Sequence, residues 1–135
     1  MWRLYSDGAS KGNPGPAGAG WVLVREGDAF LIKDSKFLGE ATNNEAEYQA
    51  LILGLKNALL LGIRDIRIYM DSELLVRQIT GLYRVKNPRL MICFQEVQDL
   101  LNKFSKYAIN HIPREQNRQA DAMANEAIKK KYSSE

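Results

Sequence analysis

The chain begins with three strand-like segments in a row, which is the feature that most restricts its fold. Segments 2–6, 20–26 and 29–40 are rich in apolar, β-branched and aromatic residues. A glycine-rich loop joins the first two, and a tight turn at "EGDA" joins the second pair. Consecutive strands with short connections favour an antiparallel meander. The first 40 residues therefore predict three neighbouring strands of one sheet.

The rest of the chain alternates between helical and strand patterns. A helical pattern that is apolar nearly all round runs from Asn43 to about Leu61 and stops at Gly62, as expected for a partly buried helix packed on a sheet. The later segments are a strand at 63–70, helices at 72–80 and 88–104, a strand at 107–112 and a helix at 117–131. Crossovers between parallel strands complete the order β-β-β-α-β-α-α-β-α. We therefore predict a single α/β domain over residues 1–135, with a five-stranded mixed sheet flanked by helices.

Composition adds limits on the environment of the protein. The 135 residues carry a net charge of +3, which is weak evidence for a polyanionic partner. The start of the chain lacks the pattern of a signal peptide, and its most apolar run is short and contains Lys56, so we expect a cytoplasmic protein without a membrane partner. Cys93 is the single cysteine and is predicted to be a small core residue. No interface element stands out, and we expect a monomer.

Two aspartates follow strand-like segments. Asp7 follows the first strand, and Asp71 follows the fourth. If these strands are parallel neighbours, both carboxylates project from adjacent carboxyl ends, where open α/β sheets bind their ligands. The alternative for Asp71 is an N-cap of the helix that begins at "SELL".

Two glutamates in "ATNNEAEYQAL" have different expected roles. Thr42 and Glu45 have the spacing of a capping box, in which each side chain binds a free backbone amide of the first turn. Glu47 is turned by roughly 200° from Glu45 about the helix axis. It therefore faces the buried side, where a carboxylate needs a cation or a hydrogen-bond donor.

The last helix contributes a fourth acid. Asp121 lies at the edge of a stripe of mostly small residues, so that this helix can approach the sheet closely; the alternative is an ordinary first-turn aspartate. Four converging carboxylates repel one another and require cations. Oxygen ligands at this density suit Mg²⁺, with Mn²⁺ as a possible substitute, and two such ions are the arrangement that catalyses phosphoryl displacement in nucleases.

These residues lie in four blocks, "YSDGASKGNPGPAGAG", "TNNEAEYQA", "IYMDSELL" and "NHIPREQNRQADAMANEA". In order and spacing they resemble the signature blocks of type 1 ribonuclease H, over nearly the whole chain. The resemblance implies a ribonuclease H fold and an endonuclease that hydrolyses the RNA strand of RNA/DNA hybrids, leaving 5′-phosphate and 3′-hydroxyl ends. It also implies that the four acids are catalytic and bind two metal ions, and that Asp7 and Asp71 bridge those ions.

The resemblance further implies a set of substrate contacts. Gly8 is expected beside the metal site and the RNA, because a glycine lets the backbone come close. The RNA strand is expected to be recognised across the minor groove through its 2′-hydroxyl groups. The residues expected to contact the hybrid are Asn13, Thr42, Asn43, Asn44 and Ser72.

Some positions depart from the family pattern. His111 has the spacing of a histidine thought to help product release, but the connection after it is compact. Arg114 could instead reach the same phosphate, as in the archaeal-like members that "PREQN" resembles. Both are retained as candidate catalytic residues.

The basic protrusion of some bacterial members is absent. Arg84, Lys86 and Arg89 would then have to contact the DNA strand. Glu40 stands where several members have an arginine of the DNA phosphate pocket, so weaker or differently placed hybrid binding is expected. The alternatives are a DNA-directed nuclease, the ribonuclease H part of a reverse transcriptase, and a non-catalytic hybrid-binding module.

Overall fold

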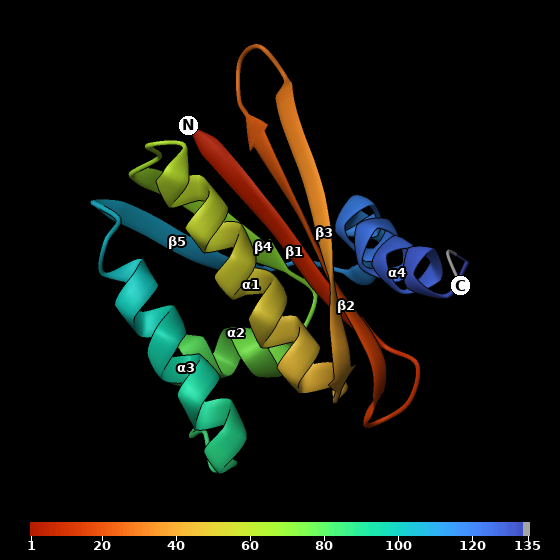
Figure 1. The fold of residues 1–135 in the computed structure, drawn as a ribbon. Helices are drawn as coiled ribbons and strands as arrows, with labels where there is room; N and C mark the ends of the chain where they lie inside the picture. The colour runs from red at the N-terminus through yellow and green to blue at the C-terminus, as the bar shows by residue number, and fades with distance from the viewer. Residues whose placement is uncertain (134–135) are drawn as a thin grey trace.

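The computed structural model describes residues 1–133, and its centre is a five-stranded sheet in the order β3-β2-β1-β4-β5. Strands β1, β2 and β3 form an antiparallel meander, and β4 and β5 continue the sheet parallel to β1 (Figure 1). The strands are β1 (Trp2–Ser10), β2 (Gly15–Arg25), β3 (Phe30–Ala41), β4 (Asp65–Met70) and β5 (Lys106–His111). The predicted mixed sheet is confirmed.

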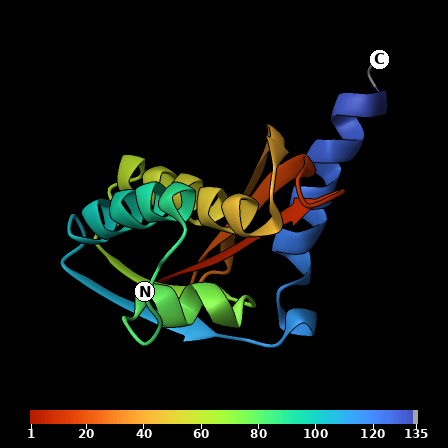
Figure 2. The same cartoon turned by 90° about the horizontal axis from the view of Figure 1, so that it is seen from below.

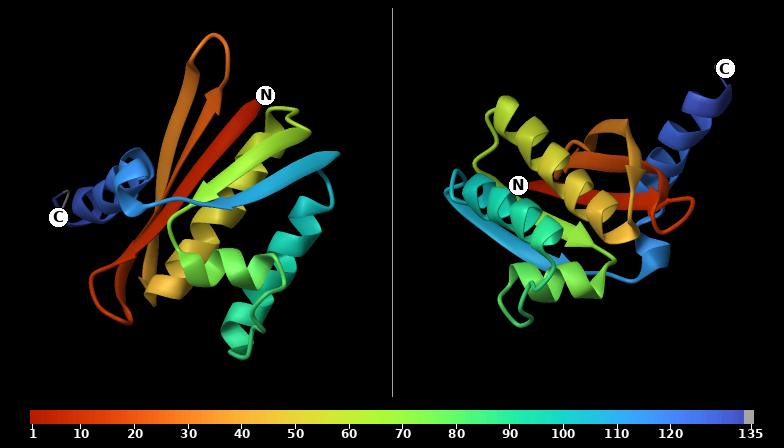
Figure 3. Two further views of the ribbon diagram at one scale, coloured as in Figure 1. Left: turned by 180° about the vertical axis from the view of Figure 1, so that it is seen from behind. Right: turned by 60° about the horizontal axis from the view of Figure 1, so that its bottom comes forward.

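The helices form layers on both faces of this sheet. They are α1 (Asn43–Leu60), α2 (Glu73–Ile79), α3 (Pro88–Leu101) and α4 (Arg118–Ser133), with a 3₁₀ turn, η1 (Arg114–Gln116), before α4. Helices α1 and α3 lie together on one face, whereas α4 crosses the other face over β2 and β3 (Figures 2 and 3). All four predicted helices are present, and η1 is an element that the sequence pattern did not predict. Within residues 1–133, no helix combines the length and the apolarity that a membrane span requires.

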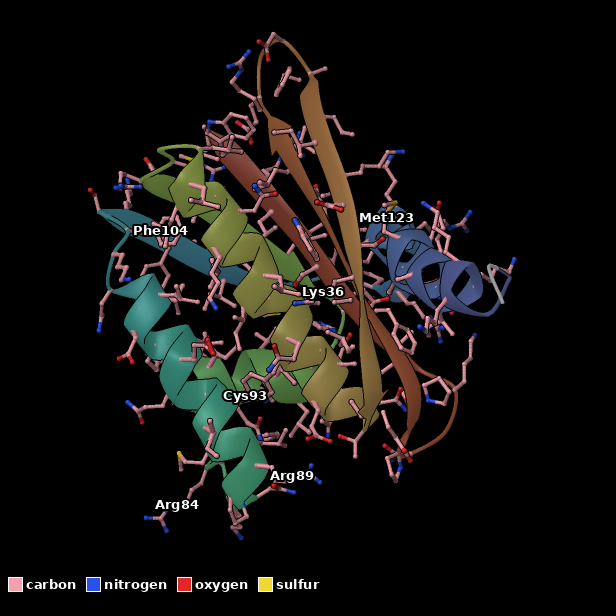
Figure 4. All side chains as sticks on the ribbon, viewed as in Figure 1. Lys36, Arg84, Arg89, Cys93, Phe104 and Met123 are labelled. Atoms are coloured by element: carbon pink, nitrogen blue, oxygen red, sulfur yellow. The ribbon has the colours of Figure 1, made fainter. Side chains whose placement is uncertain are left out.

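The core lies between the sheet and the α1 and α3 layer. Leu4 of β1 and Ile68 of β4 are fully buried there, against Leu51 and Leu55 of α1. Cys93 of α3 faces the same layer (Figure 4), where it is buried and its Sγ accepts a 3.6 Å hydrogen bond from Gln49 Nε2. The prediction of a core cysteine is therefore confirmed.

The structure corrects the predicted end of the first strand. β1 continues through Asp7 as far as Ser10, and β2 already begins at Gly15, so the loop between them is much shorter than the glycine-rich sequence suggests. Glycine and, to a lesser degree, alanine have low strand propensity, which is why the pattern predicted a loop. Pairing with β2 over this stretch supplies the backbone hydrogen bonds that hold it extended.

The small residues of β2 have a packing role. A Cβ atom added to Gly18 would lie 2.2 Å from the backbone oxygen of Ala124, and one added to Gly20 would lie 2.3 Å from that of Ala120. Side chains at these positions would push α4 away from the sheet. The glycines therefore let α4 approach closely and hold its first turns next to β1.

Candidate active site

The first two acids lie at the carboxyl ends of neighbouring parallel strands. The parallel pairing of β1 with β4 ends at Tyr5 and Tyr69, and Asp7 lies two residues beyond that point. Asp71 directly follows the last residue of β4. The N-cap of α2 is Ser72, whose hydroxyl accepts a hydrogen bond from Leu75 N. The alternative that Asp71 caps this helix is therefore wrong, and its carboxylate is available for another role.

The two glutamates of α1 are separated as predicted. Thr42 Oγ1 accepts a hydrogen bond from Glu45 N, and Glu45 Oε1 accepts one from Thr42 N, which completes the capping box. Glu47 points instead toward the sheet, where its Oε1 accepts a hydrogen bond from Gly8 N. A helix-capping acid and an acid of the site therefore lie two residues apart on α1.

Asp121 approaches from the first turn of α4. Its side-chain Oδ1 and its backbone oxygen both accept hydrogen bonds from Asn125 Nδ2, at 3.3 and 2.9 Å. Asp121 lines the same cleft, of about 380 Å³, as the other three acids. The cleft thus receives side chains from β1, α1, α4 and the end of β4.

Three of the acids are close enough to share a cation. One carboxylate oxygen from each of Asp7, Glu47 and Asp71 lies within 4.8 Å of the others, whereas Asp121 stands outside this group. Within residues 1–133, none of the four acids forms an ion pair with a lysine or arginine. Carboxylates crowded without a cationic partner fit a divalent metal, and an oxygen-only set suits Mg²⁺ or Mn²⁺.

Electrostatics within the site favours protonation when no metal is bound. Burial, together with the hydrogen bond and charge of Glu47 and the charge of Asp71, raises the pKa of Asp7 to about 11. Burial also raises the pKa of Glu47. A bound cation would reverse this preference, because it stabilises the ionised forms.

The raised pKa of Asp7 predicts how metal-free stability changes with pH. The folded state retains a proton that the unfolded chain loses above its usual pKa of 3.8. Stability is therefore expected to fall as pH rises, by up to about 1.4 kcal/mol per pH unit. Thermal unfolding in chelator between about pH 5 and about pH 8 should show this fall, and it should be smaller in Asp7→Asn. Equal slopes for the two proteins would contradict the assignment.

Two of the three predicted asparagines line the acidic cleft, and the third holds one of them in place. Asn43 Oδ1 accepts a hydrogen bond from Ser10 N, and Asn13 Oδ1 accepts one from Asn43 N, both at 3.1 Å. These bonds tie the β1–β2 loop to the start of α1. Asn43 and Asn44 line the acidic cleft, and Asn44 also lines a second pocket next to it.

The second pocket brings an arginine next to Thr42. Asn13, Thr42, Asn44 and Arg89 are among its lining residues, and Arg89 Nε lies 3.5 Å from Glu45 Oε2. Glu40 lines a different surface depression, with Pro16 and Phe37. An arginine from the N-terminal turn of α3, rather than residue 40, therefore lines the pocket next to Thr42.

Of the remaining predicted residues, some line the acidic cleft and others lie outside it. Arg114 lines the acidic cleft, and so does Ser72. His111 is exposed at the end of β5 and is not among the residues that line the cleft. Arg84 and Lys86 are exposed in the segment before α3, and Figure 4 shows Arg84 and Arg89 near the N-terminal end of that helix.

Sequence reasoning missed three polar residues near the acids. Lys11 lines the cleft, and its Nζ donates a hydrogen bond of 2.9 Å to Asn125 Oδ1. Asn117 is 1% exposed and donates to Asp71. Asn125 follows Asp121 by one helical turn, a spacing that could have identified it. No local pattern marks Asn117, because "REQN" has the composition of a surface loop.

Comparison with known proteins agrees with this geometry. Residues 5–127 match the family model described as reverse transcriptase-like. The chain is 44% identical to ribonuclease HI of Halobacterium salinarum over 93% of this chain and 63% of that protein, and 33% identical to a ribonuclease H of Sulfurovum over 96% and 92%. It spans 63% of the Halobacterium protein and 35% of mycobacterial relatives that are 41% identical to it.

Solved structures match the fold as well. RNase H1 from Halobacterium salinarum superposes with a TM-score of 0.92 at 44% identity, over 96% of this chain and 98% of that one. LC11-RNase H1, solved in complex with an RNA/DNA hybrid, gives a TM-score of 0.92 at 40% identity, over 98% and 99%. The sheet and its acidic cleft therefore define a ribonuclease H fold. Within that class, the chain belongs to the type 1 ribonuclease H family.

Proposed function

We propose that this protein is a metal-dependent endoribonuclease that hydrolyses the RNA strand of RNA/DNA hybrids and leaves 5′-phosphate and 3′-hydroxyl ends. The observation that carries the proposal is the group formed by Asp7, Glu47 and Asp71, whose ligand oxygens lie within 4.8 Å of one another. The family relationship supports it, as does the hybrid bound by LC11-RNase H1.

The acids would hold the metal ions from four elements. Asp7 and Asp71 would bind from the ends of β1 and β4, Glu47 would bind from α1, and Asp121 would complete the set from α4. Two Mg²⁺ ions, for which Mn²⁺ can substitute, would activate a water molecule and stabilise the leaving oxygen. The hydrogen bond from Gly8 N orients Glu47 for this role. The protein supplies these carboxylate oxygens from four elements of the fold, and we propose that it acts as a monomer.

The edge of the cleft would distinguish RNA from DNA. Asn43 and Asn44 present amide groups beside the acids, and amides can both donate to and accept from a 2′-hydroxyl. Asn13 holds the backbone of Asn43 in place. A DNA strand lacks the 2′-hydroxyl and would leave these groups without partners, which lowers its affinity.

The basic residues would bind phosphates on either side. Arg89, together with Thr42, forms a pocket suited to a phosphate of the DNA strand, and Arg84 and Lys86 extend the positive surface beyond it. Arg114 lines the acidic cleft, and we therefore favour it over His111 as the residue that contacts the phosphate of the RNA product.

The proposal is tested with a strand-labelled RNA/DNA hybrid. Duplex RNA, duplex DNA and single-stranded RNA serve as comparison substrates, each with Mg²⁺, with Mn²⁺ and with chelator. We expect cleavage of the hybrid's RNA strand alone, in the presence of either metal, and none with chelator. Cleavage of duplex DNA would indicate a DNA-directed nuclease, and tight hybrid binding without cleavage would indicate a non-catalytic binding module.

A further inference from the structure

One buried asparagine connects two strands beneath the acidic cleft. Asn117 lies between η1 and α4 and is 1% exposed. Its Nδ2 donates hydrogen bonds to the backbone oxygen of Ser6, at 2.9 Å, and to Asp71 Oδ2, at 3.0 Å. The backbone oxygen of Ser6 and the carboxylate oxygen of Asp71 both accept, so the two bonds fix the orientation of the amide. A single side chain therefore joins the residue before Asp7 to the carboxylate of Asp71.

Within the described part of the chain, the Asn117 side chain leaves one of its own polar atoms without a partner, which an ordinary helix cap would not do. The backbone oxygen of Asn117 accepts a hydrogen bond from Asp121 N at the start of α4, which needs no particular side chain. The side chain points away from that turn, and among residues 1–133 its Oδ1 has no hydrogen-bond partner. A buried polar atom without a partner destabilises the folded state. An unsatisfied group next to a candidate site suggests that its position serves that site.

Asp71 is the acid of the close group that most needs such support. Asp7 is 6% exposed and belongs to a strand paired on both sides up to Tyr5, and Glu47 accepts from Gly8 N. Asp71 follows the last residue of β4, so no strand pairing fixes its backbone. In the described structure, the bond from Asn117 is the hydrogen bond that holds its carboxylate.

We propose that Asn117 is a positioning residue: by donating to Asp71 Oδ2, it fixes the carboxylate that would bind the metal. An amide suits this role because it donates without adding charge, whereas a lysine or arginine would compete with the cation for the carboxylate. Partners of metal ligands commonly have this function, and their loss lowers metal affinity or activity by about 10–100-fold. The proposal rests on the proposed nuclease function only in the cleavage measurement. The metal-binding measurement does not require that function.

The test compares Asn117→Ala with a matched control, Asn110→Ala. Asn110 Nδ2 also donates to a strand carbonyl, that of Ile68, but contacts none of the acids. Mn²⁺ binding is measured by electron paramagnetic resonance on the protein without hybrid, and thermal unfolding is measured in chelator. Hybrid cleavage is then followed as kcat and KM at rising metal concentration.

Asn117→Ala is expected to bind Mn²⁺ about 10–100-fold more weakly. Its kcat should fall at limiting metal and recover in part at high metal, with KM for the hybrid unchanged, whereas Asn110→Ala should match the wild type in metal binding. If Asn117→Ala does not fold, Asn117→Ser, which leaves a smaller cavity, is measured instead.

Two results would overturn the proposal. A lower melting temperature with unchanged Mn²⁺ affinity would give Asn117 a purely structural role, and a wild-type protein that binds no Mn²⁺ would remove the basis of the inference. If the wild type binds Mn²⁺ but cleaves no hybrid, the proposed function fails while the metal-binding comparison still decides the role of Asn117.

Discussion

Replacing Glu47 by glutamine is expected to reduce hybrid cleavage by at least about 10³-fold, because a metal ligand contributes several kcal/mol to transition-state stabilisation. The fold should persist, since the glutamine Oε1 can still accept the hydrogen bond from Gly8 N. In chelator the melting temperature should stay the same or rise, because burial raises the pKa of Glu47 and the neutral amide relieves that cost. Initial rates on a labelled hybrid and thermal unfolding in chelator measure the two effects.

The control is the same substitution two residues earlier. Glu45→Gln retains the size and hydrogen-bonding geometry of the capping box, since glutamine also occurs in this motif. It loses the negative charge that pairs with the exposed Arg89 side chain, a pair worth at most about 1 kcal/mol. Cleavage should therefore stay within about 3-fold of the wild type. An inactive Glu45→Gln beside an active Glu47→Gln would show that the two glutamates have been assigned the wrong way round.

The sequence predicted the site well where a local pattern has one physical interpretation. The spacing from Thr42 to Glu45 specifies a capping box, and the helical period then directs Glu47 to the buried face. This inference needs only the backbone geometry of one element. The position of Asp71 at the carboxyl edge of the sheet was predicted less firmly, because it depended on the parallel pairing of β1 with β4 and an N-cap was its alternative.

The features that the sequence did not predict depend on contacts between distant elements. β1 and β2 stay paired through glycine and alanine because α4 packs on them, and this is not visible in their own propensities. Asn117 is buried because η1 turns the chain back against β1, and η1 itself has no strong local signal. Arg89 reaches the pocket of Thr42 because α1 and α3 pack side by side. In each case tertiary packing, rather than local pattern, determines the environment of the residue.

Electrostatics connects the burial of the acids with their need for a cation. The apolar pattern buries Asp7 and Glu47, and burial raises the pKa of each. A protein selected only for stability would replace these acids, because an unpaired buried carboxylate is costly. Their presence in one cleft is therefore explained by a bound cation, and the cost is offset when the metal is present. Metal binding must displace the protons that these acids hold at low pH, so the stabilisation by a divalent cation should increase as the pH rises.

Replacing Gly8 by alanine is expected to disrupt both stability and catalysis. A Cβ atom on Gly8 would lie 2.2 Å from the carbonyl carbon of Ala46 and 2.4 Å from Glu47 N. These are backbone atoms of α1, so the helix must move as a unit, and overpacking of this kind costs about 3 kcal/mol or more. Because Glu47 moves with the helix, a displacement of about 1 Å should lower cleavage by about 10²-fold in the protein that still folds.

Gly54→Ala provides the matched comparison, since it makes the same chemical change where α1 packs on β1. There the three atoms nearest to the added Cβ all belong to the Leu4 side chain, the closest at 2.8 Å, so a side chain rather than the helix backbone must give way. Alanine also favours the interior of a helix by about 1 kcal/mol over glycine, which offsets part of the cost of crowding the buried Leu4. Gly54→Ala should therefore lower the melting temperature less than Gly8→Ala does, and it should cleave at a rate close to that of the wild type. If Gly8→Ala behaved in the same way in thermal unfolding and in cleavage assays, the close approach of α1 to β1 would not be what positions Glu47.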